Sequence, residues 1–143
     1  MSAMTNYLEN ALIDHLFRAT AYSHSSPANW YIGLHTAAFG EDGSGGTEVS
    51  TSGTGYVRVA VARGTGTWRN DTAGDVKSTS NTSAITFAVP TANWGQITHV
   101  GIWDHVSNTT NLIIEAQLQF AKNINNGDPA PQFNAQELKF TFD

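Results

Sequence analysis

Cysteine is absent from the 143 residues, and charged side chains make up only 13% of them. Without cysteine, the chain can form neither a disulfide framework nor a thiolate metal site. The charged fraction is about half of that usual in soluble domains. No window reaches the ~20 consecutive apolar residues that a membrane-spanning helix requires. We therefore expect neither a disulfide-stapled scaffold nor a membrane-embedded protein.

Positive charge is also scarce, with seven Lys and Arg side chains and a formal net charge of −5. These seven are scattered along the chain, whereas nucleic acids and anionic membranes are bound through clustered positive charge. We expect neither as a partner. The opening MSAMTNYLENALIDHLF lacks the positive start of a signal peptide, and Glu9 and Asp14 interrupt its apolar residues. It predicts a protein that folds in the cytoplasm.

Polar uncharged residues take the place of charge: serine, threonine and asparagine fill 40 of the 143 positions. Threonine suits strands, while serine and asparagine suit turns, so this composition favours β-structure. The length fits one domain, and we expect residues 1–143 to form a single domain with a sizeable core.

Helical periodicity is clear only over residues 5–19. Leu8, Leu12 and Leu16 recur every four residues, Ile13 adds to a wide apolar stripe, and Thr5 is a suitable N-cap. We predict one N-terminal α-helix here. Its apolar stripe suits docking either on its own domain or on another protein, and both alternatives remain open.

After Pro27 the apolar residues alternate with a period of two, which is typical of β-strands. Six clear strands and two weak ones are expected, separated by turn-rich loops. They cover approximately residues 30–36, 56–63, 85–89, 100–103, 112–120 and 138–142, with weak strands near 67–68 and 76–78. In the second of these we place Val57, Val59 and Val61 on one face. The pattern predicts an antiparallel β-sandwich over 28–143, jelly-roll-like in its connections.

Histidine and acidic side chains gather in THVGIWDHVSN, residues 98–108, which raises the question of a metal or catalytic site. On a strand His99 and His105 would lie ~20 Å apart, which is too far to share a metal ion. Asp104 would face away from His99, and the stretch is better interpreted as a strand entering a polar turn. We expect Glu115 to be solvated on the polar face of its strand.

Other catalytic or cofactor motifs are missing from the sequence. It contains neither the HExxH spacing of zinc proteases nor a GxSxG nucleophile elbow. The glycine-rich run GEDGSGG has no lysine and no helix behind it, so it does not suit phosphate binding. We expect no metal, no cofactor and no enzyme activity.

Candidate interface residues come from three sources. Long loops over 40–55 and 123–136 are natural contacts between subunits, and tryptophans near loops can anchor a partner or a sugar. Most of the four tryptophans should nevertheless lie in the core. The candidates are Leu8 and Leu12 of the helix, Phe39, Glu41 and Asp42 of the glycine-rich loop, and Trp68, Trp94 and Trp103.

Two blocks of sequence are distinctive, GTEVSTSGTGYVRVAV and PTANWGQITHVGIWD. With the segments around them they resemble, over nearly the whole chain, a family of small virion proteins of tailed bacteriophages. Members are often labelled tail fibre proteins, and similar small β-sandwich proteins serve as capsid cement. The resemblance implies a non-enzymatic virion component, assembled in the host cytoplasm, and it carries over no catalytic residues.

Three functions follow as hypotheses. The first is a capsid cement or decoration protein that clamps the major capsid protein as a homotrimer. The second is a tail or fibre component involved in host attachment, which at 143 residues without repeats would be a connector or a tip. The third is a small enzyme acting on polysaccharide.

Overall fold

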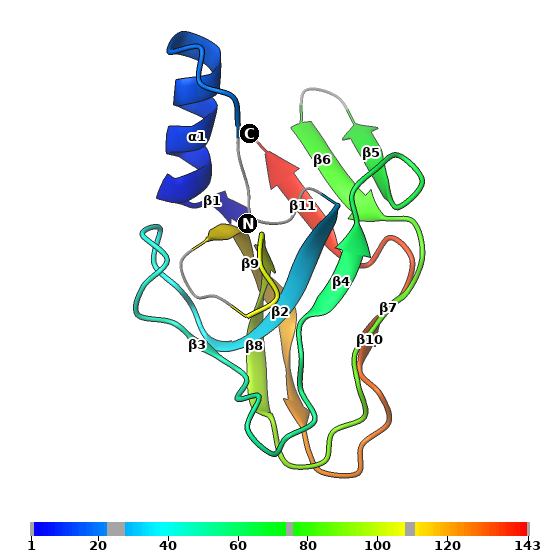
Figure 1. The fold of residues 1–143 in the computed structure, drawn as a ribbon. Coiled ribbons are helices and arrows are strands. Elements are labelled where there is room, and N and C mark those ends of the chain that lie inside the picture. The colour runs from blue at the N-terminus through cyan, green and yellow to red at the C-terminus, as the bar shows by residue number, and fades with distance from the viewer. Residues whose placement is uncertain (1, 23–27, 74–75, 108–110, 143) are drawn as a thin grey trace.

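The computed structural model describes residues 2–22, 28–73, 76–107 and 111–142. In these residues one helix and eleven strands are present (Figure 1). They are β1 (Ser2–Met4), α1 (Asn6–Phe17), β2 (Asn29–Ala37), β3 (Thr47–Glu48), β4 (Val59–Ala62), β5 (Trp68–Ala73), β6 (Val76–Asn81), β7 (Ile85–Thr86), β8 (Gly95–Trp103), β9 (Leu112–Ile124), β10 (Gln132–Phe133) and β11 (Lys139–Phe142).

The largest sheet has six strands in the order β1-β9-β8-β2-β3, and β4 also pairs with β2. Strands β2 and β8 lie inside this sheet, with pairing strands on both sides, and each has four consecutive buried residues, 32–35 and 100–103. Ile32 lies opposite Ile102, and Ile102 in turn lies opposite Ile114 of β9. These three side chains are at most 7% exposed and form the middle of the core.

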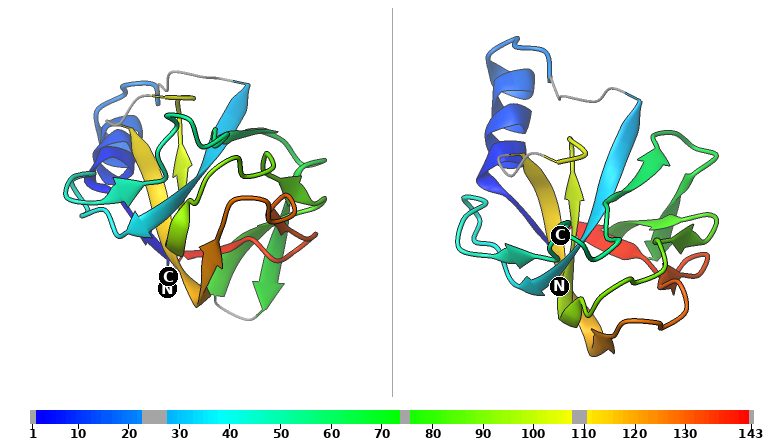
Figure 2. Two further views of the ribbon diagram at one scale, coloured as in Figure 1. Left: turned by 90° about the horizontal axis from the view of Figure 1, so that it is seen from below. Right: turned by 60° about the horizontal axis from the view of Figure 1, so that its bottom comes forward.

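Two smaller sheets, β11-β6-β5 and β10-β7, lie against the large one (Figure 2). Phe140 of β11, Ile85 of β7 and Leu138, just before β11, belong to the same hydrophobic core. Every strand pairing in the described residues is antiparallel. The prediction of a mainly β, antiparallel, sandwich-like fold with one N-terminal helix is therefore confirmed. The jelly-roll connections are not confirmed by this strand order.

Helix α1 begins after Thr5, the expected N-cap, and ends two residues earlier than predicted. The Thr5 hydroxyl does not cap the helix; it donates instead to the backbone carbonyls of Leu112 and Ile113 on β9. Strand β1 pairs with the same part of β9. The start of the helix is thus fixed to the edge of the large sheet. Its end is marked by Ala19, whose φ of 54° is left-handed.

The strand predicted over residues 56–63 is shorter in the structure, and its side chains are not distributed between the two faces as expected. Only Val59–Ala62 forms β4, and Val57 is 55% exposed, so its placement with Val59 and Val61 was wrong. Arg58 points inward instead, because its guanidinium is held by Glu48 and by a backbone carbonyl. Hydrophobic periodicity cannot predict an inward charged residue of this kind, because it assigns charged residues to the exposed face.

Other strand boundaries in the structure also differ from the predicted ones. Val89 is 57% exposed, since β7 ends at Thr86 and its partner β10 has only two residues. The weak strands near 67 and 76 are longer than expected and form the hairpin β5–β6. Strands β1, β3 and β10 were missed because each has only two or three residues. Asn108, the last residue of the stretch THVGIWDHVSN, lies outside the described residues.

Candidate functional site

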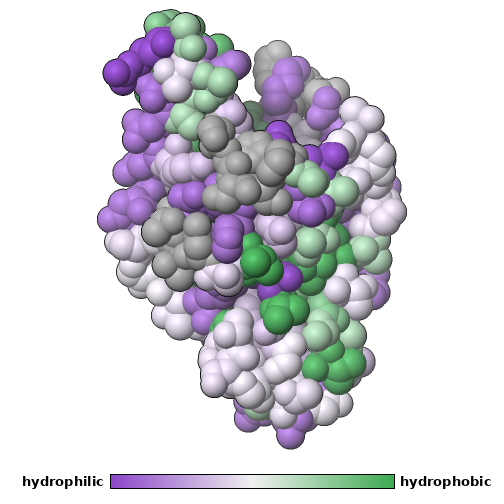
Figure 3. Space-filling view, in the orientation of Figure 1, coloured by the Kyte–Doolittle hydropathy of each residue, from purple (hydrophilic) through white to green (hydrophobic). Residues whose placement is uncertain are grey.

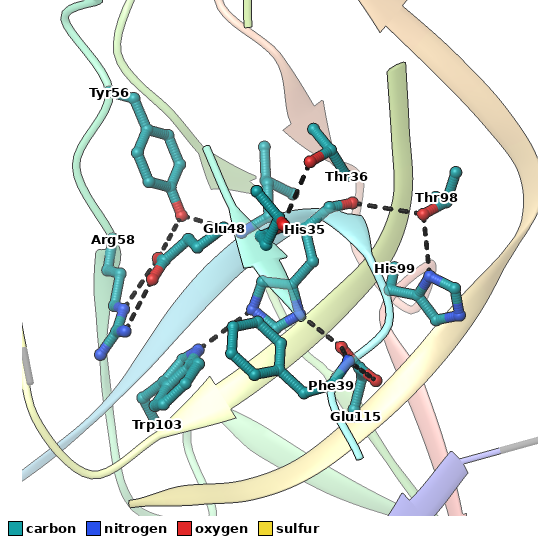
Figure 4. Close-up of polar contacts among 12 residues, drawn as sticks. His35, Thr36, Phe39, Glu48, Tyr56, Arg58, Thr98, His99, Trp103 and Glu115 are labelled. Carbon is teal, nitrogen blue, oxygen red and sulfur yellow. Dashed lines mark hydrogen bonds and ion pairs between the residues drawn. The ribbon is translucent and has the colours of Figure 1, made fainter. Parts of the chain in front are cut away.

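A network of buried and partly buried polar side chains joins β2, β3, β8 and the segment before β4 (Figure 4). Arg58 donates to both carboxylate oxygens of Glu48, at 2.8 and 2.7 Å, and to the carbonyl of His105 at 2.7 Å. The Tyr56 hydroxyl donates to the same carboxylate at 2.8 Å and accepts from the backbone N–H of Leu34. Burial and the neighbouring Glu48 charge raise the pKa of Tyr56. The phenol therefore acts as a fixed donor.

A second polar chain lies beside the first and is centred on His35. The indole N–H of Trp103 donates to Nε2 of His35 at 3.2 Å, and an indole nitrogen can only donate. Nε2 is therefore the unprotonated nitrogen, and Nδ1 carries the proton that it donates to Glu115 at 2.5 Å. The backbone N–H of Phe39 also donates to both carboxylate oxygens of Glu115, at 3.3 and 3.1 Å. Glu115 thus links the glycine-rich loop to β2 and β9.

His35 and Glu115 form the type of pair that can transfer protons in an enzyme, but the role of this pair is structural. The His35 side chain is fully buried and that of Glu115 is 10% exposed, so a substrate cannot reach the imidazole. The prediction that Glu115 is solvated was wrong. The rings of Phe39 and Trp103 pack edge-on against His35 and close the site.

A pair of glycines makes room for these rings. Gly33 on β2 lies directly opposite Gly101 on β8. A Cβ at Gly101 would stand 2.5 Å from the His35 ring, and one at Gly33 would stand 2.9 Å from the Trp103 indole nitrogen. Only glycine at both positions permits this packing, because real Cβ contacts are longer. The sequence signal was an isolated glycine within each strand, which marks close approach of another group.

The stretch THVGIWDHVSN has a structural role at Asp104. This residue is fully buried after the end of β8, and its carboxylate accepts from the Tyr7 hydroxyl at 3.2 Å and from the Asn111 amide at 2.9 Å. Burial and the Asp104 charge raise the pKa of Tyr7 to about 12. The bond joins α1 to the large sheet. Among the described residues, no group of three or more His, Asp or Glu side chains could hold a metal ion.

The far end of α1 presents apolar side chains to solvent. None of its twelve residues is buried, and exposure increases along the helix from Leu12 at 37% and Ile13 at 52% to Leu16 at 70% and Phe17 at 81%. These four residues, which we call the α1 apolar end, form two pairs four residues apart and so lie on one side of the helix. Figures 1 and 3 show this end projecting from the body.

A cavity of about 680 Å³ lies beside α1, between the large sheet and the β11-β6-β5 sheet. Its apolar wall includes Leu8 of α1, Ile102 of β8 and Phe140 of β11. Trp30 and Trp68 also line it, one from each sheet. The volume is in the range of small-molecule sites in proteins, about 300–1,000 Å³.

The sequence-predicted interface residues are dispersed in the structure. Trp94 and Trp103 are 4% and 0% exposed, so in this structure neither lies on a surface that a partner could reach. Trp94 donates to the carbonyl of Thr54 and fixes the loop before β4. The other candidates divide between the α1 side, with Leu8, Leu12 and Trp68, and the glycine-rich loop, with Phe39, Glu41 and Asp42. Their contact with a partner stays a prediction.

Within the glycine-rich loop, Asp42 forms a local turn. Its carboxylate accepts from the hydroxyl and the backbone N–H of Ser44, and these bonds lower the pKa of Asp42. The loop also meets α1, because the carbonyl of Glu41 accepts from the backbone N–H of Asn6 at 2.8 Å. The missed feature of this region is Glu115, which ties the loop to the sheet and which strand alternation assigned to solvent.

Comparison with protein families gives one clear result. The model of the family described as podophage GP4 fiber I protein gp80 matches residues 3–141. The chain belongs to this family. It is therefore a structural protein of a tailed-phage virion, as the sequence resemblance implied. The match includes β1 from Ala3, all of α1 and all but the last residue of β11.

The gp80 family match covers both the body and the projecting helix. No match was found among curated proteins. Over the described residues, no helix is both long enough and apolar enough to cross a membrane.

Proposed function

We propose that this gp80-family protein is a non-enzymatic fibre subunit of a podophage virion. The family description supports a fibre in preference to capsid cement, since it names a fibre protein and matches nearly the whole chain. Its most concentrated buried polar groups, around Arg58 and His35, are engaged in holding loops to the large sheet. That arrangement suits a mechanical component.

The α1 apolar end is the structural observation that carries this proposal. A helix fixed to the body at its start and apolar at its far end is suited to an attachment role, since exposed apolar patches mark interaction sites. Thr5 and Tyr7 anchor the start, while Phe17 and Leu16 are the most exposed apolar residues of the helix. We infer that a neighbouring virion subunit covers these residues in the assembled particle.

Capsid cement is the second candidate, and the shape of the body favours it. The sheets form a short body in all three views, with no elongated shaft in the described residues (Figures 1 and 2). In this role the protein would bind the major capsid protein as a homotrimer, and the α1 apolar end would face the shell.

The copy number and position of the protein in purified virions separate the two candidates. Quantitative mass spectrometry against the major capsid protein should give a few copies per particle for a fibre subunit and hundreds for cement. Cryo-electron microscopy of particles labelled with a specific antibody fragment should place label at the tail. Label distributed over the capsid shell would reject the fibre proposal in favour of cement.

A further inference from the structure

The cavity beside α1 combines an apolar floor with aromatic walls. Ile102, Ile114 and Phe140 supply aliphatic and aromatic surface from both sheets. Trp30 and Trp68 stand on β2 and β5, and both are only partly buried and packed against the core. Broad aromatic faces of this kind can stack on the C–H face of a sugar ring, since a tryptophan is a large apolar body with one polar group.

Polar groups are placed around the same cavity. The guanidinium of Arg63 lies 4.6 Å from the centre of the Trp30 ring, which holds a cation at the edge of the aromatic wall. Thr65 and Asn70 also line the cavity. Among the described residues no hydrogen-bond partner is present for the buried indole N–H of Trp68. An unsatisfied buried donor is costly and favours a ligand that carries acceptors.

These features discriminate between ligand classes. A purely apolar ligand would leave the buried Trp68 donor unpaired. An anionic ligand would find one cation, Arg63, within a mainly apolar wall. A saccharide with an apolar substituent suits both sets of groups, because its ring matches the tryptophans, its hydroxyls match the polar groups and its methyl group matches the apolar lining that includes Ile102 and Ile114. A cavity of about 680 Å³ is large enough for a small-molecule ligand of that kind.

We propose that this cavity is a binding site for N-acetylated sugars, with Trp30 and Trp68 as stacking platforms and Asn70 and Arg63 as hydrogen-bonding groups. The site belongs to the folded body of one chain. Its occupancy is therefore independent of whether the protein is a fibre subunit or cement, and the two proposals can fail separately.

Titration of the purified full chain with N-acetylglucosamine, N-acetylgalactosamine and tri-N-acetylchitotriose tests the proposal. Tryptophan fluorescence is a direct readout, because Trp30 and Trp68 line the cavity while Trp94 and Trp103 are buried elsewhere. At least one acetylated sugar should bind, and more tightly than its counterpart glucose, galactose or cellotriose.

Variants assign the binding to the cavity. Trp68→Ala should weaken binding about tenfold, the equivalent of ~1.4 kcal/mol. Because Trp68 also packs against the core, Asn70→Ala provides a second test at an exposed position, with weaker binding and unchanged melting. Phe120→Ala is the matched control, since Phe120 is 79% exposed and does not line the cavity.

Three outcomes would overturn the site. The first is the absence of binding by all three acetylated sugars at the highest soluble concentration. The second is binding that survives Trp68→Ala and Asn70→Ala unchanged. The third is self-association of the wild type that Trp68→Ala abolishes, which would show that a second copy occupies the cavity.

Discussion

The guanidinium of Arg58 lies over the ring of Trp103, 3.9 Å from its centre, while two of its nitrogens donate to Glu48 and the third donates to the His105 carbonyl. The Arg58 side chain is 3% exposed and that of Glu48 17%. Such a pair is costly to break, because removing one partner leaves a buried charge without its counterion.

Arg58→Met should therefore lower the free energy of unfolding by about 3–5 kcal/mol, measured by urea denaturation. Arg18→Met is the control, since Arg18 forms an exposed pair with Asp14 on α1 and should contribute less than about 0.5 kcal/mol. The double change of Arg58→Met with Glu48→Gln should lose less than Arg58→Met alone, because no buried charge remains. Equal losses for Arg58→Met and Arg18→Met would contradict the buried network.

The glycine pair gives a second prediction. Gly101→Ala should destabilise the protein by about 1–3 kcal/mol, because the added Cβ would overlap the His35 ring and Leu112. Gly66→Ala is the matched control: a Cβ at Gly66 meets nothing within 4 Å, so its effect should stay within about 0.5 kcal/mol. Thermal melting of the two variants side by side measures the difference. A stable Gly101→Ala protein would show that the rings can move apart.

Alkaline pH should weaken the fold through Tyr7. Its phenol has a pKa of about 12 in the folded chain against 10.0 for the free side chain. The raised pKa means that stability is complete below pH 10 and is lost as pH rises toward 12, where only the unfolded chain ionises readily. Tyr56, whose pKa is also raised, adds to the same trend.

Denaturation midpoints measured from neutral pH to about pH 12 should therefore fall above pH 10. Tyr7→Phe should be less stable at neutral pH, since Asp104 loses a donor, but its midpoint should fall less steeply above pH 10. An unchanged alkaline slope in Tyr7→Phe would mean that this phenol ionises equally in both states.

The α1 apolar end predicts that a substitution there reduces assembly into virions without changing the stability of the isolated protein. Phe17→Ser should leave the melting temperature of the isolated protein unchanged, because this ring is 81% exposed, yet reduce its incorporation into virions. Phe120→Ser is the matched control, with a 79% exposed ring on β9. Complementation of phage lacking the gene, followed by immunoblotting of purified particles, measures incorporation. Equal incorporation of both variants would reject α1 as the attachment surface.

Alternating hydrophobicity predicted β2 and most of β9, where one or both faces are apolar, but of β8, which begins at Gly95, it predicted only residues 100–103. The helix was also predictable, because Leu8, Leu12 and Leu16 repeat at helical spacing. The order of the strands in the sheet could not be predicted from the sequence, because β1 pairs with a strand that lies more than a hundred residues further along the chain.

The buried polar network could not be predicted from strand alternation. Arg58, Glu115 and Asp104 have residue types that are usually exposed, yet all three are buried or largely buried, and each has a partner from a distant segment: the His105 carbonyl, His35 and Tyr7, respectively. The isolated glycines Gly33 and Gly101 were the available signal. Their meaning depends on facing each other across β2 and β8, which only the register reveals.

The attachment of α1 also imposes an order in time. Thr5 is held by Ile113, 108 residues later in the chain, so a ribosome must release β9 before the helix can settle on the sheet. Contacts between such distant residues form slowly. A truncated chain that stops before β9 would therefore leave α1 unanchored. Only chains that extend through β9 would present the helix in its final orientation, so chains that stop earlier would lack a correctly placed α1 for assembly.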